Sequence, residues 1–155
     1  MANWFIPNRD FIKDLAINTG TTSSPTYSII CTASEIGIDT DLEEKDFYTF
    51  CDALQRKIIT GASVVLSGTI KVDVNNAGVM KLVEDLHTLI ADGEVSQFNK
   101  VMIQFKLLTG VKNEVLEYTT YTANATLSLS DMGGSAEDES EIGFEMQLIG
   151  TATGV

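Results

Sequence analysis

The sequence predicts a mainly β chain: an antiparallel β-sandwich or open barrel with one packed α-helix and long loops. Two observations carry this prediction. Segments rich in β-branched and aromatic residues lie on both sides of a single segment with helical spacing, and no alternation of strand and helix appears. The 155 residues fit one domain, and a 44% share of hydrophobic residues is enough for a core.

Residues 1–25 are predicted to form an N-terminal arm ahead of a single β-domain over residues 26–155. Trp4, Phe5 and Ile6 are apolar and are followed by a proline, while glycine, threonine, serine and proline fill positions 20–25. An apolar anchor on such an arm usually finds a partner, either on its own domain or on a neighbour.

The first predicted strand runs from Tyr27 to Ile38, and the acidic segment 39–46 is expected to be a solvated loop. Residues 47–60 fit both a helical and a strand period, and we favour extended structure because most of the later apolar segments are β-like. Alternation from Ser63 to Val74, with one apolar face and one mostly polar face, predicts a half-buried antiparallel strand.

One helix is predicted from the Asn75-Asn76 cap to about Ala91, with Gly93 as its stop signal. Its apolar residues share one stripe: Val79, Leu82, Val83, Leu86 and Ile90. Three further strands are predicted, in the segments 101–108, 115–129 and 141–151.

The net charge of −12 argues against tight binding to nucleic acid or to an anionic membrane. No apolar run approaches the ~20 residues that span a bilayer. Cys31 and Cys51 have no cysteine or histidine at metal-ligand spacing, so we expect reduced core cysteines, with a disulfide between them as the alternative.

No motif predicts catalysis, a cofactor or a metal. His87 lies on the flank of the helical stripe, and no spacing in the sequence suggests a nucleophile or a second acid that could act with it in catalysis. The acidic run 137–141 lacks the order of a calcium loop, and Gly133-Gly134 is not followed by the Lys of a phosphate loop. We therefore expect a protein that is not an enzyme.

Three stretches resemble the major tail proteins, or tail tube proteins, of siphophages. They are TGASVVLSGTIKVDVN from Thr60, QFNKVMIQFKLLTG from Gln97, and GSAEDESEIGFEMQLIGTAT from Gly134. The last is the most specific, since an acidic turn before a final alternating strand is a recurrent ending in that family. The resemblance covers residues 25–155.

The resemblance implies a structural virion protein that forms six-subunit rings, which stack into a hollow tube for DNA. Sheets from the subunits would join into a barrel around the lumen, the helix would lie outside, and arms and loops would bridge rings. Expected partners are further copies of the chain, the tape measure protein, the tail terminator and the distal tail protein. DNA would pass without specific binding, and assembly would take place in the cytoplasm of the host bacterium.

Two residue sets follow as expectations for such a tube. The candidates for contacts between subunits are Trp4, Phe5, Ile6, Phe47 and Phe50, because aromatic residues concentrate at interface cores. The candidates for acidic residues that face the lumen are Glu35, Asp39, Glu114 and Glu117, with ordinary surface as the alternative.

Two other functions stay open. One is the tube protein of a contractile tail, a phage-tail-like bacteriocin or a secretion system. The other is a β-sandwich module that binds carbohydrate or protein, which would need exposed aromatic residues clustered on one sheet face.

Overall fold

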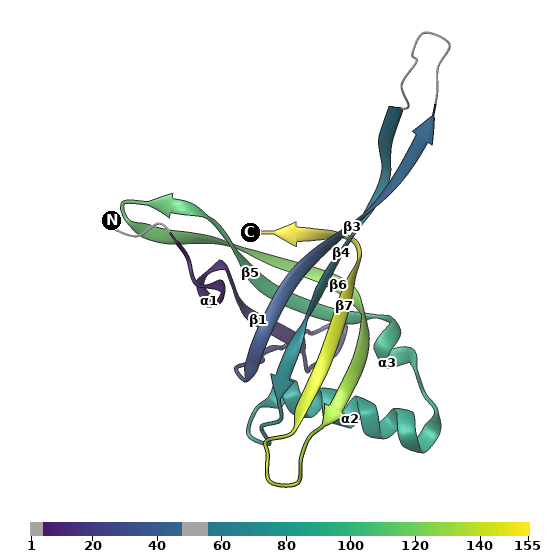
Figure 1. Ribbon diagram of the computed structural model, residues 1–155. Coiled ribbons are helices and arrows are strands. Elements are labelled where there is room, and N and C mark those ends of the chain that lie inside the picture. The colour runs from purple at the N-terminus through teal and green to yellow at the C-terminus, as the bar shows by residue number, and fades with distance from the viewer. Residues whose placement is uncertain (1–4, 48–55) are drawn as a thin grey trace.

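A computed structural model describes residues 5–47 and 56–155 of the chain. Within these ranges, seven strands form one antiparallel sheet in the order β2-β1-β5-β6-β7-β4-β3 (Figure 1). The strands are β1 (Ile12–Asn18), β2 (Tyr27–Ile29), β3 (Ala33–Phe47), β4 (Arg56–Lys71), β5 (Val101–Lys112), β6 (Val115–Gly133) and β7 (Glu141–Gly154). The helices are α1 (Asn8–Phe11), α2 (Ala77–Asp92) and α3 (Ser96–Asn99). The prediction of a mainly β, antiparallel fold with a packed helix is confirmed.

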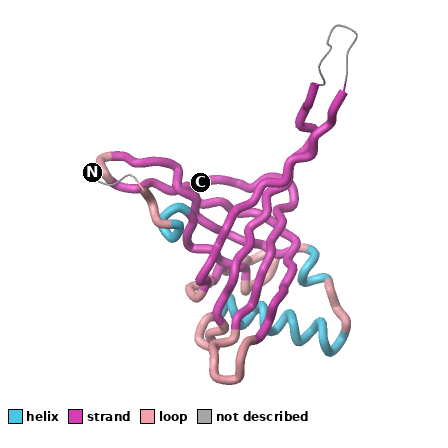
Figure 2. Tube along the Cα trace, in the orientation of Figure 1, coloured by secondary structure: helices cyan, strands magenta, loops and turns pink. Residues whose placement is uncertain are grey.

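The predicted sandwich proves to be one continuous sheet that curls around a single core. Leu15 and Ile17 of β1 belong to the same buried cluster as Leu66 of β4 and Met146 of β7, although these strands lie in different halves of the sheet order. Figure 2 shows the two halves of the sheet crossing above α2. The open-barrel form of the prediction is therefore the better description.

Helix α2 begins and ends where the sequence predicts. The Asn76 side chain accepts a hydrogen bond from the Val79 amide at 3.1 Å, which caps the first turn. Gly93 takes a left-handed conformation with φ of 65° and donates its amide to the Leu89 carbonyl at 2.9 Å. Val79 and Leu82 are fully buried and fix the helix against the core.

Within the arm predicted for residues 1–25, Ile12–Asn18 form the buried strand β1, which lies between β2 and β5 in the sheet. The sequence does not predict this strand, because the register between β1 and β5 shifts between Lys13 and Ala16, where Asp14 has φ of 54°. A bulge of this kind breaks the period of two, so buried and exposed residues do not alternate in the sequence.

The loop predicted for residues 39–46 is also wrong, because these residues continue β3 and pair with β4 as far as Phe47 and Arg56. β7 pairs with β4 only over Val65–Lys71. Residues 40–47 and 56–64 therefore form a two-stranded ribbon that projects from the body (Figure 1). Charged side chains persist in this strand because the ribbon has no core to exclude them.

Two smaller predictions differ from the structure. The strand predicted from Tyr27 to Ile38 is split between β2 and β3 by residues 30–32. Cys31 lies in that connection and is exposed, so it is not a core cysteine, while Cys51 lies outside the described residues.

Candidate functional site

One half of the sheet, formed by β3, β4, β7 and β6, has a polar face opposite the core. Residues that pair directly across antiparallel strands point to the same face, so the register gives rows such as Gly37, Ser67, Glu145 and Ser128. We call this surface the polar face. By the same register it comprises Glu35, Gly37, Asp39, Asp41, Glu43, Ser63, Val65, Ser67, Thr69, Lys71, Glu141, Gly143, Glu145, Gln147, Thr126, Ser128 and Ser130.

The charges of the polar face are negative except for Lys71, which forms an ion pair with Glu139 at one end of the face. Two adjoining hollows, of about 480 and 470 Å³, lie on it and share Asp41, Val65 and Glu145. Asp39 lines the first and Glu43 the second, and among the described residues neither has a basic residue in its lining. Such a surface repels the phosphates of a nucleic acid instead of binding them.

The predicted acidic candidates divide between two places. Glu35 and Asp39 lie on the polar face. Glu114 lies in the turn between β5 and β6, with φ of 64°, and Glu117 pairs with Gly110 near the same turn. Glu117 shares the side of β6 that carries the buried Ala123, which is the opposite side of the sheet from Glu35. The four residues therefore do not share one surface.

Sequence reasoning missed Asp41, Glu43 and Glu145. The signal for Glu145 is visible in the last strand, where Gly143, Glu145 and Gln147 alternate with apolar residues. Asp41 and Glu43 follow Asp39 with the same period of two, but the density of charge there favoured a loop.

The residues predicted to contact other subunits lie at two ends of the described chain. Phe5 is 90% exposed and Ile6 is half-buried, just before α1. Phe47 is half-buried at the end of β3, where it pairs with Arg56. Trp4 and Phe50 lie outside the described residues, and the contacts themselves stay a prediction.

The four-stranded half also has two open strand edges. β3 is the last strand of the sheet, so one edge of Ala33–Phe47 has no strand beside it in the described chain. β6 pairs with β5 only as far as Ala125, opposite Val101, so the residues from Thr126 onwards have no described strand on that side. Open edges of this length are templates for pairing with another chain.

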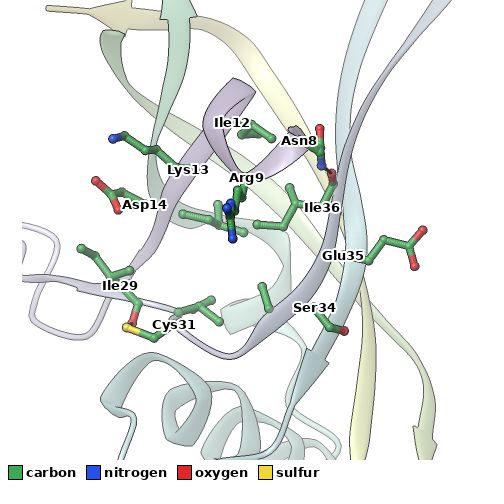
Figure 3. A pocket seen from close by; sticks show the side chains of 13 residues that line it. Asn8, Arg9, Ile12, Lys13, Asp14, Ile29, Cys31, Ser34, Glu35 and Ile36 are labelled. Atoms are coloured by element: carbon green, nitrogen blue, oxygen red, sulfur yellow. Dashed lines mark hydrogen bonds between the residues drawn. The ribbon is translucent and has the colours of Figure 1, made fainter. Parts of the chain in front are cut away.

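A third hollow, of about 320 Å³, marks the seam where the sheet curls toward itself (Figure 3). It lies between α1, β1 and the start of β3, and its lining includes Arg9, Asp14 and Glu35. Across it the Asn8 side-chain amide donates a hydrogen bond of 2.7 Å to the Ile36 carbonyl. This bond ties the N-terminal segment to the far end of the sheet order, so the hollow is a structural seam.

No chemical centre emerges from the ranges 5–47 and 56–155. No group of three histidine, cysteine, aspartate or glutamate residues there is placed to hold a metal ion. His87 is exposed on α2. None of the described helices is both long and apolar enough to cross a bilayer.

Comparison with solved structures assigns the fold. The chain matches the tail of an empty gene transfer agent particle, determined with C6 symmetry, at a TM-score of 0.60 and 15% identity, over 97% of this chain and 99% of the other. It matches the SPP1 tail tube at a TM-score of 0.57 and 14% identity, over 94% and 76%. This chain has the tail tube fold.

Proteins of contractile machines have the same fold. The sheath/tube terminator structure of an extracellular contractile injection system matches at a TM-score of 0.57 and 13% identity, over 100% of this chain and 99% of the other. No protein-family model and no curated protein sequence matches the chain. Identities this low establish the tail tube fold and leave the kind of tail open.

Proposed function

We propose that the chain is the structural subunit of a viral tail tube, a hollow conduit of stacked six-subunit rings through which DNA passes. The observation that carries the proposal is the match of nearly the whole chain to tail and tail tube structures. The role is structural and not enzymatic.

The surface of the subunit supports this role. Four strands with a polar, acidic face on one side and a packed core on the other suit the wall of an aqueous channel. In the proposed tube, Glu35, Asp39, Asp41, Glu43 and Glu145 face the lumen, where their charges prevent lasting contacts with phosphate.

The remaining proposals concern how the subunits assemble and which proteins they meet. Trp4, Phe5, Ile6, Phe47 and Phe50 stay our candidates for contacts between subunits. A tape measure protein, a tail terminator and a distal tail protein would define the length and the ends of the tube, and assembly would take place in the cytoplasm of the host.

Electron microscopy of the concentrated, purified chain tests the proposal. We expect rings or tubes with a central channel, which appear as concentration rises. A chain that stays monomeric at every concentration, and also in the presence of other virion components, would contradict the proposed function.

A second candidate is the tube of a contractile tail or injection system, favoured by the likeness to contractile injection structures. Co-expression with a sheath protein encoded beside the chain distinguishes the two, because only a contractile tube would be coated by the sheath. The binding-module alternative is weakened, since the described polar face carries no aromatic residue.

A further inference from the structure

Residues 7–14, which comprise α1 and the start of β1, form a strap across the seam hollow. At one end of the strap, the Asn8 side-chain amide donates a hydrogen bond of 2.7 Å to the Ile36 carbonyl of β3 (Figure 3). At the other end, the Tyr118 hydroxyl of β6 donates a hydrogen bond of 2.6 Å to the Asp10 carbonyl. The strap therefore links β3, the last strand in the sheet order, to β6.

The Ile36 carbonyl belongs to the open edge of β3. Lys71 of β4 donates its amide to the Thr32 carbonyl at 3.0 Å, so alternate residues of β4 from Lys71 back to Ser63 direct their backbone groups at β3. Their register partners on β3 are the odd-numbered residues from Glu35 onwards. The even-numbered residues, beginning with Ile36, therefore direct their backbone groups at the open edge.

The strap blocks this edge at its beginning. An antiparallel ladder requires every second residue of the edge to exchange backbone hydrogen bonds with its partner. A new strand cannot use the Ile36 carbonyl in this way while Asn8 is bonded to it. α1 also lies beside the edge at this point, since Asn8 and Arg9 line the same hollow as Ser34 and Glu35. In the isolated subunit, the start of β3 is therefore closed to pairing.

The strap is weakly fastened. α1 has four residues, none of them buried, and its N-cap residue makes no side-chain cap. Asp14 has φ of 54°, a strained value for a residue other than glycine, and its ion pair with Lys106 at 3.2 Å joins two half-exposed side chains. Burial begins at Ile12, so release of residues 7–11 uncovers no buried residue of the strap. Local opening of such a segment costs little free energy.

We propose that the strap is an autoinhibitory latch, which closes the start of the β3 edge in the free subunit and leaves it when a neighbouring subunit binds. The proposal rests on the proposed function, in which the sheets of neighbouring subunits join. A subunit with a closed latch cannot complete that contact, so the rate of assembly follows the fraction of subunits whose latch is open. The latch thereby protects free subunits from unscheduled pairing at an open strand edge.

Two substitutions loosen the latch from its opposite ends. Asn8→Ala removes the donor to β3, whereas Tyr118→Phe removes the donor to Asp10 and keeps the ring beneath the Lys13 ammonium. We expect each variant to assemble at least about threefold faster than the parent at equal concentration, because the loss of one hydrogen bond raises the open fraction by roughly that factor or more. Light scattering measures the rate, and electron microscopy identifies the rings or tubes formed.

Asn99→Ala is the matched control, since Asn99 is an exposed asparagine of the other four-residue helix, α3, and should leave the rate unchanged. The sign of the effect distinguishes a latch from a contact that only stabilises the subunit, whose loss would slow assembly. Thermal unfolding of each monomer shows that it is folded. Unchanged or slower assembly of either folded latch variant would overturn the proposal.

The position of the strap in the tube gives an independent test. We expect cryo-electron microscopy of tubes of the parent chain to show Asn8 away from Ile36, with the Ile36 carbonyl paired to the backbone of a neighbouring subunit. Tubes in which the bond between Asn8 and Ile36 persists would overturn the latch while leaving the proposed function intact. A parent chain that forms neither rings nor tubes would overturn the proposed function, and the latch with it.

Discussion

The body of the subunit and the ribbon of β3 and β4 are built from the same kind of strand but differ in what lies beside them. In the body, β4 lies between β3 and β7, and Leu66 and Ile70 have no exposed surface. In the ribbon, the same strand pairs only with β3, and Ile58 and Ile59 are 47% and 60% exposed. A two-stranded ribbon is marginal in water, so the ribbon depends on a neighbour in a way that the body does not.

Amide hydrogen exchange should show the largest difference, within a single strand. Exchange in residues 58–64 is expected to be at least about 100-fold faster than in residues 66–70, because the ribbon opens locally while the body opens only on unfolding. Mass spectrometry of the monomer measures both segments. Assembly should slow the ribbon and leave the body unchanged, and equal protection of both segments in the monomer would contradict the comparison.

Gly68→Ala should cause the largest loss of stability among the single substitutions, and it acts in the body, where β4 pairs with both β3 and β7. A Cβ at Gly68 would lie 1.8 Å from the Glu35 carbonyl oxygen, where β3 shifts register against β4. Backbone would have to move, so we expect a loss of more than about 3 kcal/mol in the free energy of unfolding, measured by urea denaturation.

Gly110→Ala is the matched control, since a Cβ there meets nothing within 4 Å. A similar small loss in both variants would show that β3 can retreat from β4 without cost.

Truncation of one apolar side chain in each region sharpens the comparison. Met146→Ala, in the body, removes a side chain with no exposure and should cost about 2–5 kcal/mol of unfolding free energy. Leu42→Ala, in the ribbon, should cost less than about 1 kcal/mol in the monomer, because nearly half of the side chain is already in water. Chemical denaturation measures both, and a larger loss for Leu42→Ala would reverse the assignment of the core.

Loss of the cap of α2 tests a local element of the body. Asn76→Ala removes the acceptor for the Val79 amide and also the side-chain donor to the Ile29 carbonyl, and it should cost about 1 kcal/mol or more of unfolding free energy. Asn75→Ala, one residue before the cap, is the control. A drop in thermal midpoint of the same size for both variants would mean that the cap does not stabilise the helix.

The ion pair between Lys71 and Glu139 should have the smallest effect, because both side chains are exposed. The hydrogen bond and charge of Lys71 hold the pKa of Glu139 below its ordinary value of 4.5, and Glu139 raises the pKa of Lys71. A lowered carboxyl pKa stabilises the fold above the unfolded pKa, and this stabilisation is lost as pH falls through the folded value.

Lys71→Met should return the pKa of Glu139 toward 4.5, as measured by NMR titration of the carboxyl carbon. The pH dependence of stability below that value should weaken slightly. An unchanged Glu139 titration would show that the pair does not persist in solution.

The sequence by itself determined the elements that depend on local patterns, in which the residue types of one segment indicate its buried side chains or the ends of its helix. Alternation from Ser63 to Lys71 and in the last strand fixed which residues face the core, whereas the predicted continuation to Val74 is wrong because β4 ends at Lys71 and Val74 is exposed. Asn76 and Gly93 fixed the ends of α2. These signals are local, since a strand repeats every two residues and a cap acts within one turn.

Only the tertiary structure decided what depends on distant pairing. The sequence did not predict β1, because the bulge after Lys13 breaks its alternation, and it did not predict the ribbon half of β3, because charged residues there indicated a loop. No local period shows that such a segment will be paired as a strand. Strand pairing also decides that Glu35 and Asp39 share the polar face with Glu145, whereas Glu117 lies on the opposite side of the sheet. Register between strands far apart in sequence sets the face on which each charge lies, and a shift of one residue would reverse it.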